Sequence, residues 1–196
     1  MISSEYTLDR PVIEIFEAVA AGGAKIVQLR EKQKGAKYLY ELAIACRPIA
    51  NHYGILLIID DHVDVALAAK ADGVHLGQED LPIPVARSIA PNLWLGNSTH
   101  NLEEALAAQA AGADYINIGP IYPTQTKKVN CNALGIDAIR EIAPQINLPF
   151  TVMGGIKKKC IPELIHAGAK HIAMVTEVTQ APDVEAKVKE LRALFL

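Results

Sequence analysis

Polar and charged side chains follow most of the short apolar runs of this sequence, and they are the first candidates for chemistry. Gln28, Arg30 and Lys32 alternate with other residues, so in an extended strand they share one face. Two cations and an amide on one face could bind a single anion. A charge cluster exposed to solvent at the end of a strand explains the same three residues equally well, so this group alone decides nothing.

Adjacent carboxylates follow directly on another apolar run. Asp60 and Asp61 come after Leu-Leu-Ile-Ile, and Asp80 follows the next run along the chain. Burying a carboxylate costs free energy unless a cation or a hydrogen-bond donor compensates. Asp61 and Asp80 could each cap the helix that follows, which is the ordinary structural explanation. Both roles are compatible, and two carboxylates on neighbouring loops suit Mg²⁺, which completes its octahedron with water and phosphate oxygens.

Hydroxyl groups and a glycine pair supply candidates for further anion sites. Ser98 lies in a run of polar residues whose hydroxyls could donate to phosphate, although capping of the next helix explains one of them. Thr124, Thr126 and Lys127 lie in a connection of about 15 residues, which is longer than most and typical of active-site lids. Gly155 belongs to a Gly-Gly pair, which allows backbone amides to approach a ligand closely.

Apolar runs and amphipathic stretches alternate along the whole chain. Continuous apolar runs are typical of strands buried on both faces of a parallel sheet, and helical spacing of the intervening stretches is typical of helices that cover it. A small residue followed by glycine precedes several runs, as at the end of a helix. The predicted strands are 25–30, 55–60, 73–77, 94–98, 115–120, 150–154 and 171–176. The predicted helices are 11–21, 38–53, 63–69, 84–90, 102–110, 136–143, 161–167 and 182–196.

These units predict one α/β domain over residues 1–196, with a (β/α)8 TIM barrel as the first choice. A barrel of eight strands needs one more strand before Pro11, and residues 1–4 hold only its last residues, so we expect the first strand to be truncated. An open, doubly wound sheet is the alternative, although no Gly-x-Gly-x-x-Gly follows the first strand. In a barrel the active site lies at the carboxyl ends of the strands, and phosphate commonly binds after the last two.

Composition and charge exclude several classes of protein. Of the 196 residues, 51% are hydrophobic and the net charge is −3, which argues against a disordered chain and against a global attraction to nucleic acid. The cysteines Cys46, Cys131 and Cys160 are odd in number and far apart, so neither a disulfide framework nor a zinc site is expected. The first residues do not form a leader, and no apolar run reaches the length of a membrane span. We therefore expect a cytoplasmic protein without a nucleic-acid or membrane partner.

Taken together, six segments resemble the thiamine-phosphate synthase family, and the resemblance covers almost the whole chain. They are 28–32 (QLREK), 59–64 (IDDHVD), 73–82 (GVHLGQEDLP), 96–100 (GNSTH), 114–127 (DYINIGPIYPTQTK) and 154–156 (GGI). The resemblance implies a (β/α)8 barrel that joins 4-amino-2-methyl-5-(diphosphooxymethyl)pyrimidine to 4-methyl-5-(phosphooxyethyl)thiazole. It also implies a dissociative displacement, in which pyrophosphate leaves first and the thiazole nitrogen captures a pyrimidine cation.

The resemblance further implies roles for individual residues and a Mg²⁺ cofactor. The residues implied for the pyrimidine diphosphate are Gln28, Leu29, Arg30, Glu31, Lys32, Asp60, Ser98 and Lys127. Those implied for the thiazole phosphate are Thr124, Gln125, Thr126, Gly155, Val175 and Thr176. Asp61 and Asp80 are the implied Mg²⁺ ligands. Arg30, Lys32 and Lys127 are the implied catalytic residues, since cations stabilise charge that builds on departing pyrophosphate.

The chain departs from the family pattern at two places besides its first strand. Asp60 stands where Asn is frequent, and Thr176-Glu177 stands where a Ser and a small residue are usual. Glu177 beside a phosphate would be unfavourable unless it points away. Two alternatives remain: a thiazole tautomerase of the same fold, and a phosphate-ligand binder without catalysis. Joint retention of Asp61, Asp80 and Lys127 argues against the tautomerase, which has no need of a diphosphate site.

Overall fold

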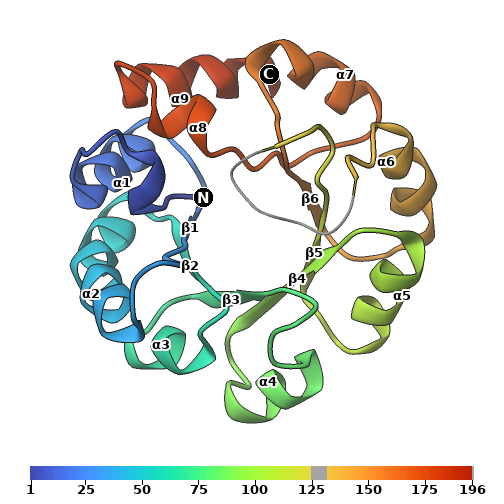
Figure 1. The fold of residues 1–196 in the computed structure, drawn as a ribbon, viewed down its shortest axis with the longest axis horizontal. Helices are drawn as coiled ribbons and strands as arrows, with labels where there is room; N and C mark the ends of the chain where they lie inside the picture. Colours follow the sequence, from blue (N-terminus) through green and yellow to red (C-terminus); the bar gives the residue numbers. More distant parts are fainter. Residues whose placement is uncertain (125–131, 196) are drawn as a thin grey trace.

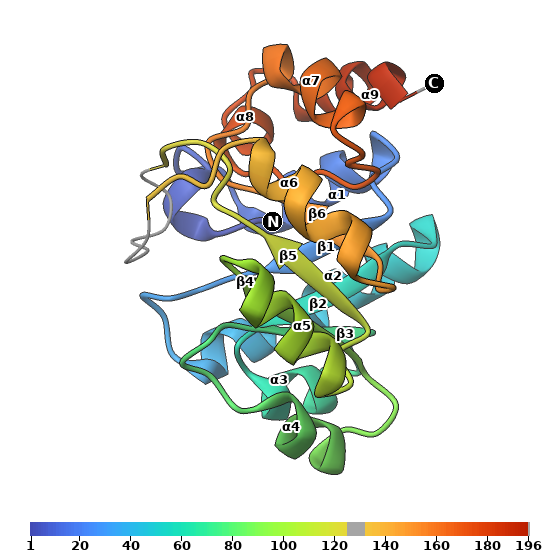
Figure 2. The ribbon, with the colours of Figure 1, turned by 90° about the vertical axis from the view of Figure 1, so that its right-hand side faces the viewer.

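The structure is a computed structural model, and it describes residues 1–124 and 132–195. A parallel sheet curves round the centre of the molecule and a ring of helices surrounds it (Figures 1 and 2). Its six strands pair in sequence order: β1 (Ile26–Leu29), β2 (Leu56–Asp60), β3 (Gly73–Leu76), β4 (Trp94–Thr99), β5 (Tyr115–Ile118) and β6 (Phe150–Val152). A doubly wound sheet reverses its strand order at one point, so that alternative is wrong for this chain.

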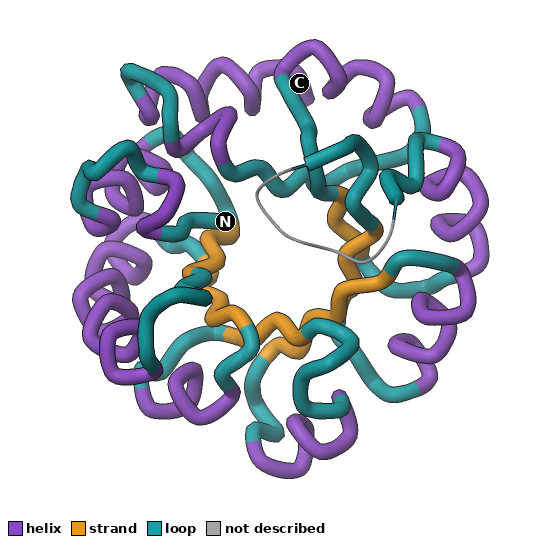
Figure 3. Tube along the Cα trace, viewed as in Figure 1, coloured by secondary structure: helices purple, strands orange, loops and turns teal. Residues whose placement is uncertain are grey.

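Residues near the two ends of the chain lie at the two edges of the sheet. Ile2 forms an isolated parallel bridge to Leu29 of β1, and Ile172 forms another to Val152 of β6. The Met1 nitrogen donates to the Met174 carbonyl across 3.1 Å, so these two segments meet. Figure 3 shows strands on an arc and loop segments over the remainder of the ring. The barrel prediction is thus confirmed only in part, since the described residues form a TIM-like half-barrel of six parallel strands.

The strand predicted over 171–176 is reduced to a single parallel bridge, Ile172 to Val152 of β6. The Val152 amide donates to the His171 carbonyl across 3.1 Å, and the Ala173 amide donates to the Val152 carbonyl across 2.9 Å. A short helix, α8 (Thr176–Thr179), then begins at once and turns the backbone away from the sheet. Too few extended residues remain for a ladder of hydrogen bonds.

The helices lie outside the strands because each has an apolar side that packs against them. They are α1 (Val12–Ala21), α2 (Ala36–Tyr53), α3 (Val63–Ala68), α4 (Ile83–Ile89), α5 (Leu102–Ala110), α6 (Asp137–Ile142), α7 (Ile161–His166) and α9 (Val184–Arg192), besides α8. Phe16 of α1, Leu39 of α2, Leu57 of β2 and Ile116 of β5 all belong to one buried hydrophobic core. Burying such a side chain stabilises the fold by roughly 1.5–3 kcal/mol. Within the described residues, no helix is both long and apolar enough to span a bilayer.

Two aspartates before strands form matching ion pairs at the amino-terminal ends of the strands. Asp72, just before β3, accepts hydrogen bonds from the Leu57 amide and from Arg47 of α2, both across 2.7 Å.

Asp114, just before β5, repeats this arrangement two strands later. It accepts a hydrogen bond from the Leu95 amide across 2.7 Å and one from Arg87 of α4 across 2.6 Å. Each carboxylate therefore ties a helix to two neighbouring strands, on the side of the sheet away from the strands' carboxyl ends.

Candidate active site

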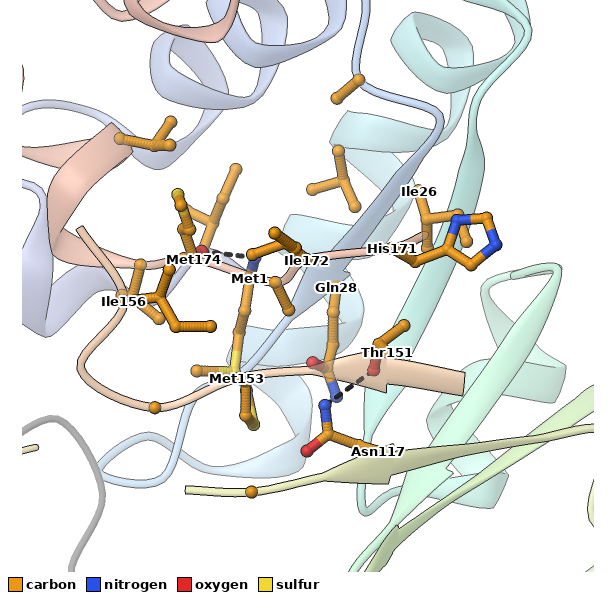
Figure 4. A pocket seen from close by; sticks show the side chains of 18 of the residues that line it. Met1, Ile26, Gln28, Asn117, Thr151, Met153, Ile156, His171, Ile172 and Met174 are labelled. Carbon is orange, nitrogen blue, oxygen red and sulfur yellow. Dashed lines mark hydrogen bonds between the residues drawn. The ribbon is translucent and has the colours of Figure 1, made fainter. Parts of the chain in front are cut away.

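A cavity of about 490 Å³ lies inside the curve of the sheet. Polar side chains from successive strands line one part of it: Gln28, Arg30, Asp60, His75, Ser98, Tyr115, Asn117 and Thr151. Apolar side chains line another part, among them Ile26, Met153, Ile172 and Met174 (Figure 4). Such a lining suits a ligand with a flat organic part and a polar group that must be held in one orientation.

Asp60 anchors the polar part of this cavity at the end of β2. The Gln28 side-chain amide donates to Asp60 Oδ1 across 2.7 Å, and Arg30 Nε lies 3.2 Å from Asp60 Oδ2. Asp60 and Arg30 are 8% and 7% exposed, so their opposite charges compensate one another in a largely dry environment. Gln28 and Arg30 thus converge on a carboxylate of the chain, whereas Lys32, expected on the same anion, pairs with Asp61.

Leu29 and Glu31 point elsewhere. The Leu29 side chain is fully buried in the hydrophobic core. Glu31 accepts hydrogen bonds from the amide and the hydroxyl of Ser4, across 2.7 and 2.6 Å. Alternation along a strand sends every second side chain to the opposite face, which accounts for both placements. Neither side chain lines the cavity.

Asp61 and Asp80 meet next to Asp60. Asp61 adopts a left-handed backbone conformation, with φ of 63°, which is uncommon for a residue other than glycine. This turn brings its carboxylate to the Lys32 ammonium and to the carboxylate of Asp80. Asp80 also accepts a hydrogen bond from the Gly77 amide across 2.6 Å.

The capping explanation for these two aspartates is wrong. The N-cap residues of the helices α3 and α4 are His62 and Pro82, not Asp61 and Asp80. The two carboxylates face each other instead of a helix end.

The pKa values of the two carboxyl groups are shifted in opposite directions. Burial alone would raise the pKa of Asp61, but hydrogen bonds from Lys32 and Asp80 and the charge of Arg30 hold it below its ordinary value. Burial raises the pKa of Asp80, and the neighbouring Asp61 raises it further. Two carboxylates in contact repel unless a proton or a cation lies between them. Their donor set therefore fits a hard divalent cation.

Several of the residues implied for a second phosphate also line the cavity. Thr124, Gly155, Val175 and Thr176 all line it. The Tyr122 amide donates to the Gly154 carbonyl across 3.0 Å, which holds the loop after β5 against the loop after β6.

Gly155 fits this close approach because it is a glycine. Its φ is 63°, and a Cβ there would lie 2.9 Å from the Tyr122 Cβ. The close approach is to the chain's own loop, and the predicted approach of the Gly-Gly amides to a ligand stays a prediction. Gln125, Thr126 and Lys127 lie outside the residues that the structure describes.

Glu177 is held by lysines. Its carboxylate lies 3.4 Å from Lys157 Nζ and accepts a hydrogen bond from the Lys158 amide across 3.3 Å. The unfavourable effect expected of this residue is reduced accordingly, because its charge is paired with a cation.

The cavity lining also includes polar residues that lie within the strands, among them His75, Tyr115, Asn117 and Thr151. The Asn117 side chain donates to the Thr151 hydroxyl across 2.7 Å (Figure 4). Their positions inside apolar runs, instead of after them, made them hard to identify from the sequence. A polar residue inside an apolar run was the available signal.

Comparison with known proteins places the fold and the site in context. The sequence profile of the thiamine monophosphate synthase family matches residues 1–178. The chain belongs to this family. Two family members show how extensive the similarity is. The thiamine-phosphate synthase of Pelotomaculum thermopropionicum is 43% identical over 192 residues, covering 97% of this chain and 88% of the relative. That of Shouchella clausii is 44% identical over 190 residues, covering 96% and 91%.

A solved structure from the same family has the same fold. It is the thiamine phosphate pyrophosphorylase of Pyrococcus furiosus, which superposes with a TM-score of 0.92 at 38% identity. The superposition covers 99% of this chain and 93% of that one. The resemblance inferred from the six segments is thus confirmed over nearly the whole length.

Proposed function

We propose that this protein is a thiamine-phosphate synthase, an enzyme of thiamine biosynthesis. One substrate is the aminopyrimidine diphosphate and the other is the thiazole phosphate. The thiazole nitrogen forms a bond to the pyrimidine part of the first substrate, and pyrophosphate is released. The observation that carries the proposal is the contact between Asp61, Asp80 and Lys32, next to the Arg30–Asp60 pair that lines the cavity. Membership of the family, with relatives of that name above 40% identity, supports the same reaction.

Cations next to a diphosphate are what a dissociative displacement needs. Arg30 and Lys32 stabilise negative charge that accumulates on the leaving pyrophosphate, and Lys127 joins them by the family resemblance. Gln28 and Ser98 bind and orient the pyrimidine diphosphate. Thr124, Gly155 and Thr176 also line the cavity, and they bind the thiazole phosphate. No nucleophile of the protein takes part, because the thiazole nitrogen itself forms the new bond.

Asp61 and Asp80 would hold Mg²⁺ in this enzyme. Their facing carboxylates supply two hard oxygen donors, and Mg²⁺ takes the remainder of its six ligands from water and phosphate. In the described part of the chain, no group of three or more His, Cys, Asp or Glu gathers as a richer cation site would require. When bound, the ion neutralises charge on the diphosphate.

The proposal also includes a complete barrel and a cellular location. Residues 1–2 and 171–174 would serve as the first and eighth members of a (β/α)8 barrel, since they bridge β1 and β6 and contact each other. Both substrates carry phosphate groups, and such ions do not cross a bilayer unaided. We therefore expect the reaction in the cytoplasm.

Pyrophosphate release from the two purified substrates tests the function directly. We expect turnover with Mg²⁺, no turnover after chelation, and recovery when Mg²⁺ is added back. Asp80→Ala and Lys127→Ala should each abolish turnover. The matched controls are Asp137→Ala and Lys37→Ala, since these side chains are 91% and 89% exposed, and both should retain full activity.

The same assay separates the alternatives. Aromatisation of the thiazole without the pyrimidine substrate would replace the proposal by a tautomerase. Tight calorimetric binding of both phosphates without product would replace it by a ligand binder. Robust turnover in Asp80→Ala would reject the role given to the carboxylate pair.

A further inference from the structure

Three neighbouring strands place one glycine between two large polar side chains. In the sheet register, His75 of β3 lies opposite Gly96 of β4, and Gly96 lies opposite Tyr115 of β5. Residues in register on adjacent strands point to the same face, so His75 and Tyr115 approach each other over the glycine. A Cβ on Gly96 would lie 2.5 Å from His75 Nδ1 and closer still to the Tyr115 ring. Because Gly96 has no side chain, the two rings can meet in the space above it.

His75 links Tyr115 to Ser98 through its two ring nitrogens. Nδ1 lies 3.1 Å from the Tyr115 hydroxyl, and Nε2 lies 3.0 Å from Ser98 Oγ. The His75 and Ser98 side chains are almost completely buried, since the residues are 7% and 6% exposed. All three residues line the cavity, and Ser98 is the one implied for the diphosphate.

The tautomer of His75 sets the direction of both hydrogen bonds. A neutral imidazole has one N–H donor and one acceptor nitrogen. Burial raises the pKa of Tyr115, and the charges of Asp60 and Asp114 raise it further, so the phenol keeps its proton. A Tyr115 hydroxyl that donates to Nδ1 makes Nε2 the protonated nitrogen. Nε2–H then donates to Ser98 Oγ, and the hydroxyl hydrogen of Ser98 is left to donate to a ligand.

We propose that Tyr115 and His75 are positioning residues that make the Ser98 hydroxyl a hydrogen-bond donor to the diphosphate. This inference rests on the proposed function for the identity of the anion. In the opposite tautomer Ser98 would donate to Nε2 and would present only lone pairs to the anion. A Tyr115 hydroxyl that donates to Nδ1 opposes that tautomer, and Gly96 allows the contact. The three residues thus extend the site from the end of the strands into the sheet itself.

The tautomer of His75 can be measured without substrate. In protein labelled with ¹⁵N at its histidines, two-bond ¹⁵N–¹H spectra distinguish Nε2–H from Nδ1–H. The chain has six histidines, and the His75→Gln variant identifies the signals of this one. We expect the Nε2–H form in the wild type and a mixture of the two forms in Tyr115→Phe. An Nδ1–H form in the wild type, or an unchanged spectrum in Tyr115→Phe, would overturn the proposal.

Kinetics of a double-mutant cycle test whether Tyr115 acts through Ser98. Removing a preorganised donor to a developing anion lowers kcat by about 100-fold, which we expect of Ser98→Ala. Tyr115→Phe should lower kcat about 10-fold with little change in KM, because the hydroxyl is misoriented in only part of the molecules. In the Ser98→Ala background the same change should have less than about a twofold effect, since coupled residues are not additive. If the kcat losses of Tyr115→Phe and Ser98→Ala multiply in the double variant, the proposal is overturned.

Two variants at His75 separate positioning from packing. The His75→Gln side chain can still donate to Ser98 Oγ through its amide, whereas that of His75→Leu cannot. We expect His75→Gln to retain at least about tenfold more kcat than His75→Leu at equal melting temperature. Equal activities would argue for packing alone. A wild type that releases no pyrophosphate would refute the proposed function, while the tautomer measurement would still decide the hydrogen-bond assignment.

Discussion

Replacing Asp72 by alanine removes one acceptor that serves two donors at once. The Leu57 amide and the Arg47 guanidinium both donate to Asp72 Oδ2, across 2.7 Å each. The Arg47 side chain is 15% exposed, so its charge would be left nearly buried without this partner. Hydrogen bonds to charged groups contribute about 1.5–3 kcal/mol each. Since the Asp72 carboxylate is 31% exposed and partly hydrated, we take the lower end and expect a total loss of about 2–3 kcal/mol.

Asp114 provides an internal comparison. It accepts the same two kinds of hydrogen bond, but its side chain is 38% exposed and that of its partner Arg87 is 32% exposed. Water can replace more of what is lost, so Asp114→Ala should cost only about 1–2 kcal/mol. Asp72→Asn should fall between the wild type and Asp72→Ala, because an amide oxygen still accepts from Leu57 but carries no charge for Arg47.

Urea unfolding measures these differences. We expect the urea concentration at the unfolding midpoint to be lower for Asp114→Ala than for the wild type, and lower still for Asp72→Ala. The dependence of the unfolding free energy on urea concentration should not change. For a domain of this length about 1 kcal/mol corresponds to a shift of roughly 2–4 °C in melting temperature. The rate of pyrophosphate release should not change, because both aspartates lie at the end of the strands away from the site. A loss below about 0.5 kcal/mol for Asp72→Ala, or a larger loss for Asp114→Ala, would refute the reasoning.

Three further changes have definite expected outcomes. Asn101→Ala removes the side chain that accepts from the Glu104 amide at the start of α5, and calorimetry should show a loss of about 1 kcal/mol. Gly155→Ala puts a methyl group against Tyr122 at a positive φ, so it should cost about 1–3 kcal/mol and lower turnover; unchanged values for both would contradict the packing described. Hydrogen bonds from Lys158 and Lys187 lower the pKa of Glu190 to about 2, which a carboxyl NMR titration can confirm. Because this pKa is lowered, the Glu190 carboxylate stabilises the fold at pH values above the ordinary pKa of a glutamate. This contribution is lost as the pH falls toward 2. Glu190→Gln should therefore reduce the stability of the fold at pH 7 but not at pH 2.

Much of the site could be predicted from the sequence because its residues follow apolar runs. Parallel strands all end on one side, so the order of the motifs along the chain was enough to bring Arg30, Asp60 and Ser98 to one cavity. The contact between Asp61 and Asp80 depends on a left-handed backbone at Asp61, which no local pattern indicated. For that reason helix capping remained an equally reasonable explanation.

Two other features needed the three-dimensional register. Residues 171–176 have the composition of a strand, but Thr176 begins a helix, and pairing is limited to one bridge. His75 and Tyr115 are 40 positions apart, and their contact exists only because both lie opposite Gly96. A sequence pattern shows which residues alternate along one strand, but it does not show which residues of neighbouring strands are opposite each other.

The glycine between His75 and Tyr115 has a consequence for how this chain can change over time. Any side chain at position 96 would collide with both rings, so a replacement there is tolerated only after smaller residues have appeared at positions 75 and 115. Reversing the order of these steps passes through an intermediate that packs badly. Substitutions at the three positions should therefore accumulate as compensating sets. A directed-evolution experiment that randomises position 96 alone, with His75 and Tyr115 unchanged, should recover glycine almost exclusively.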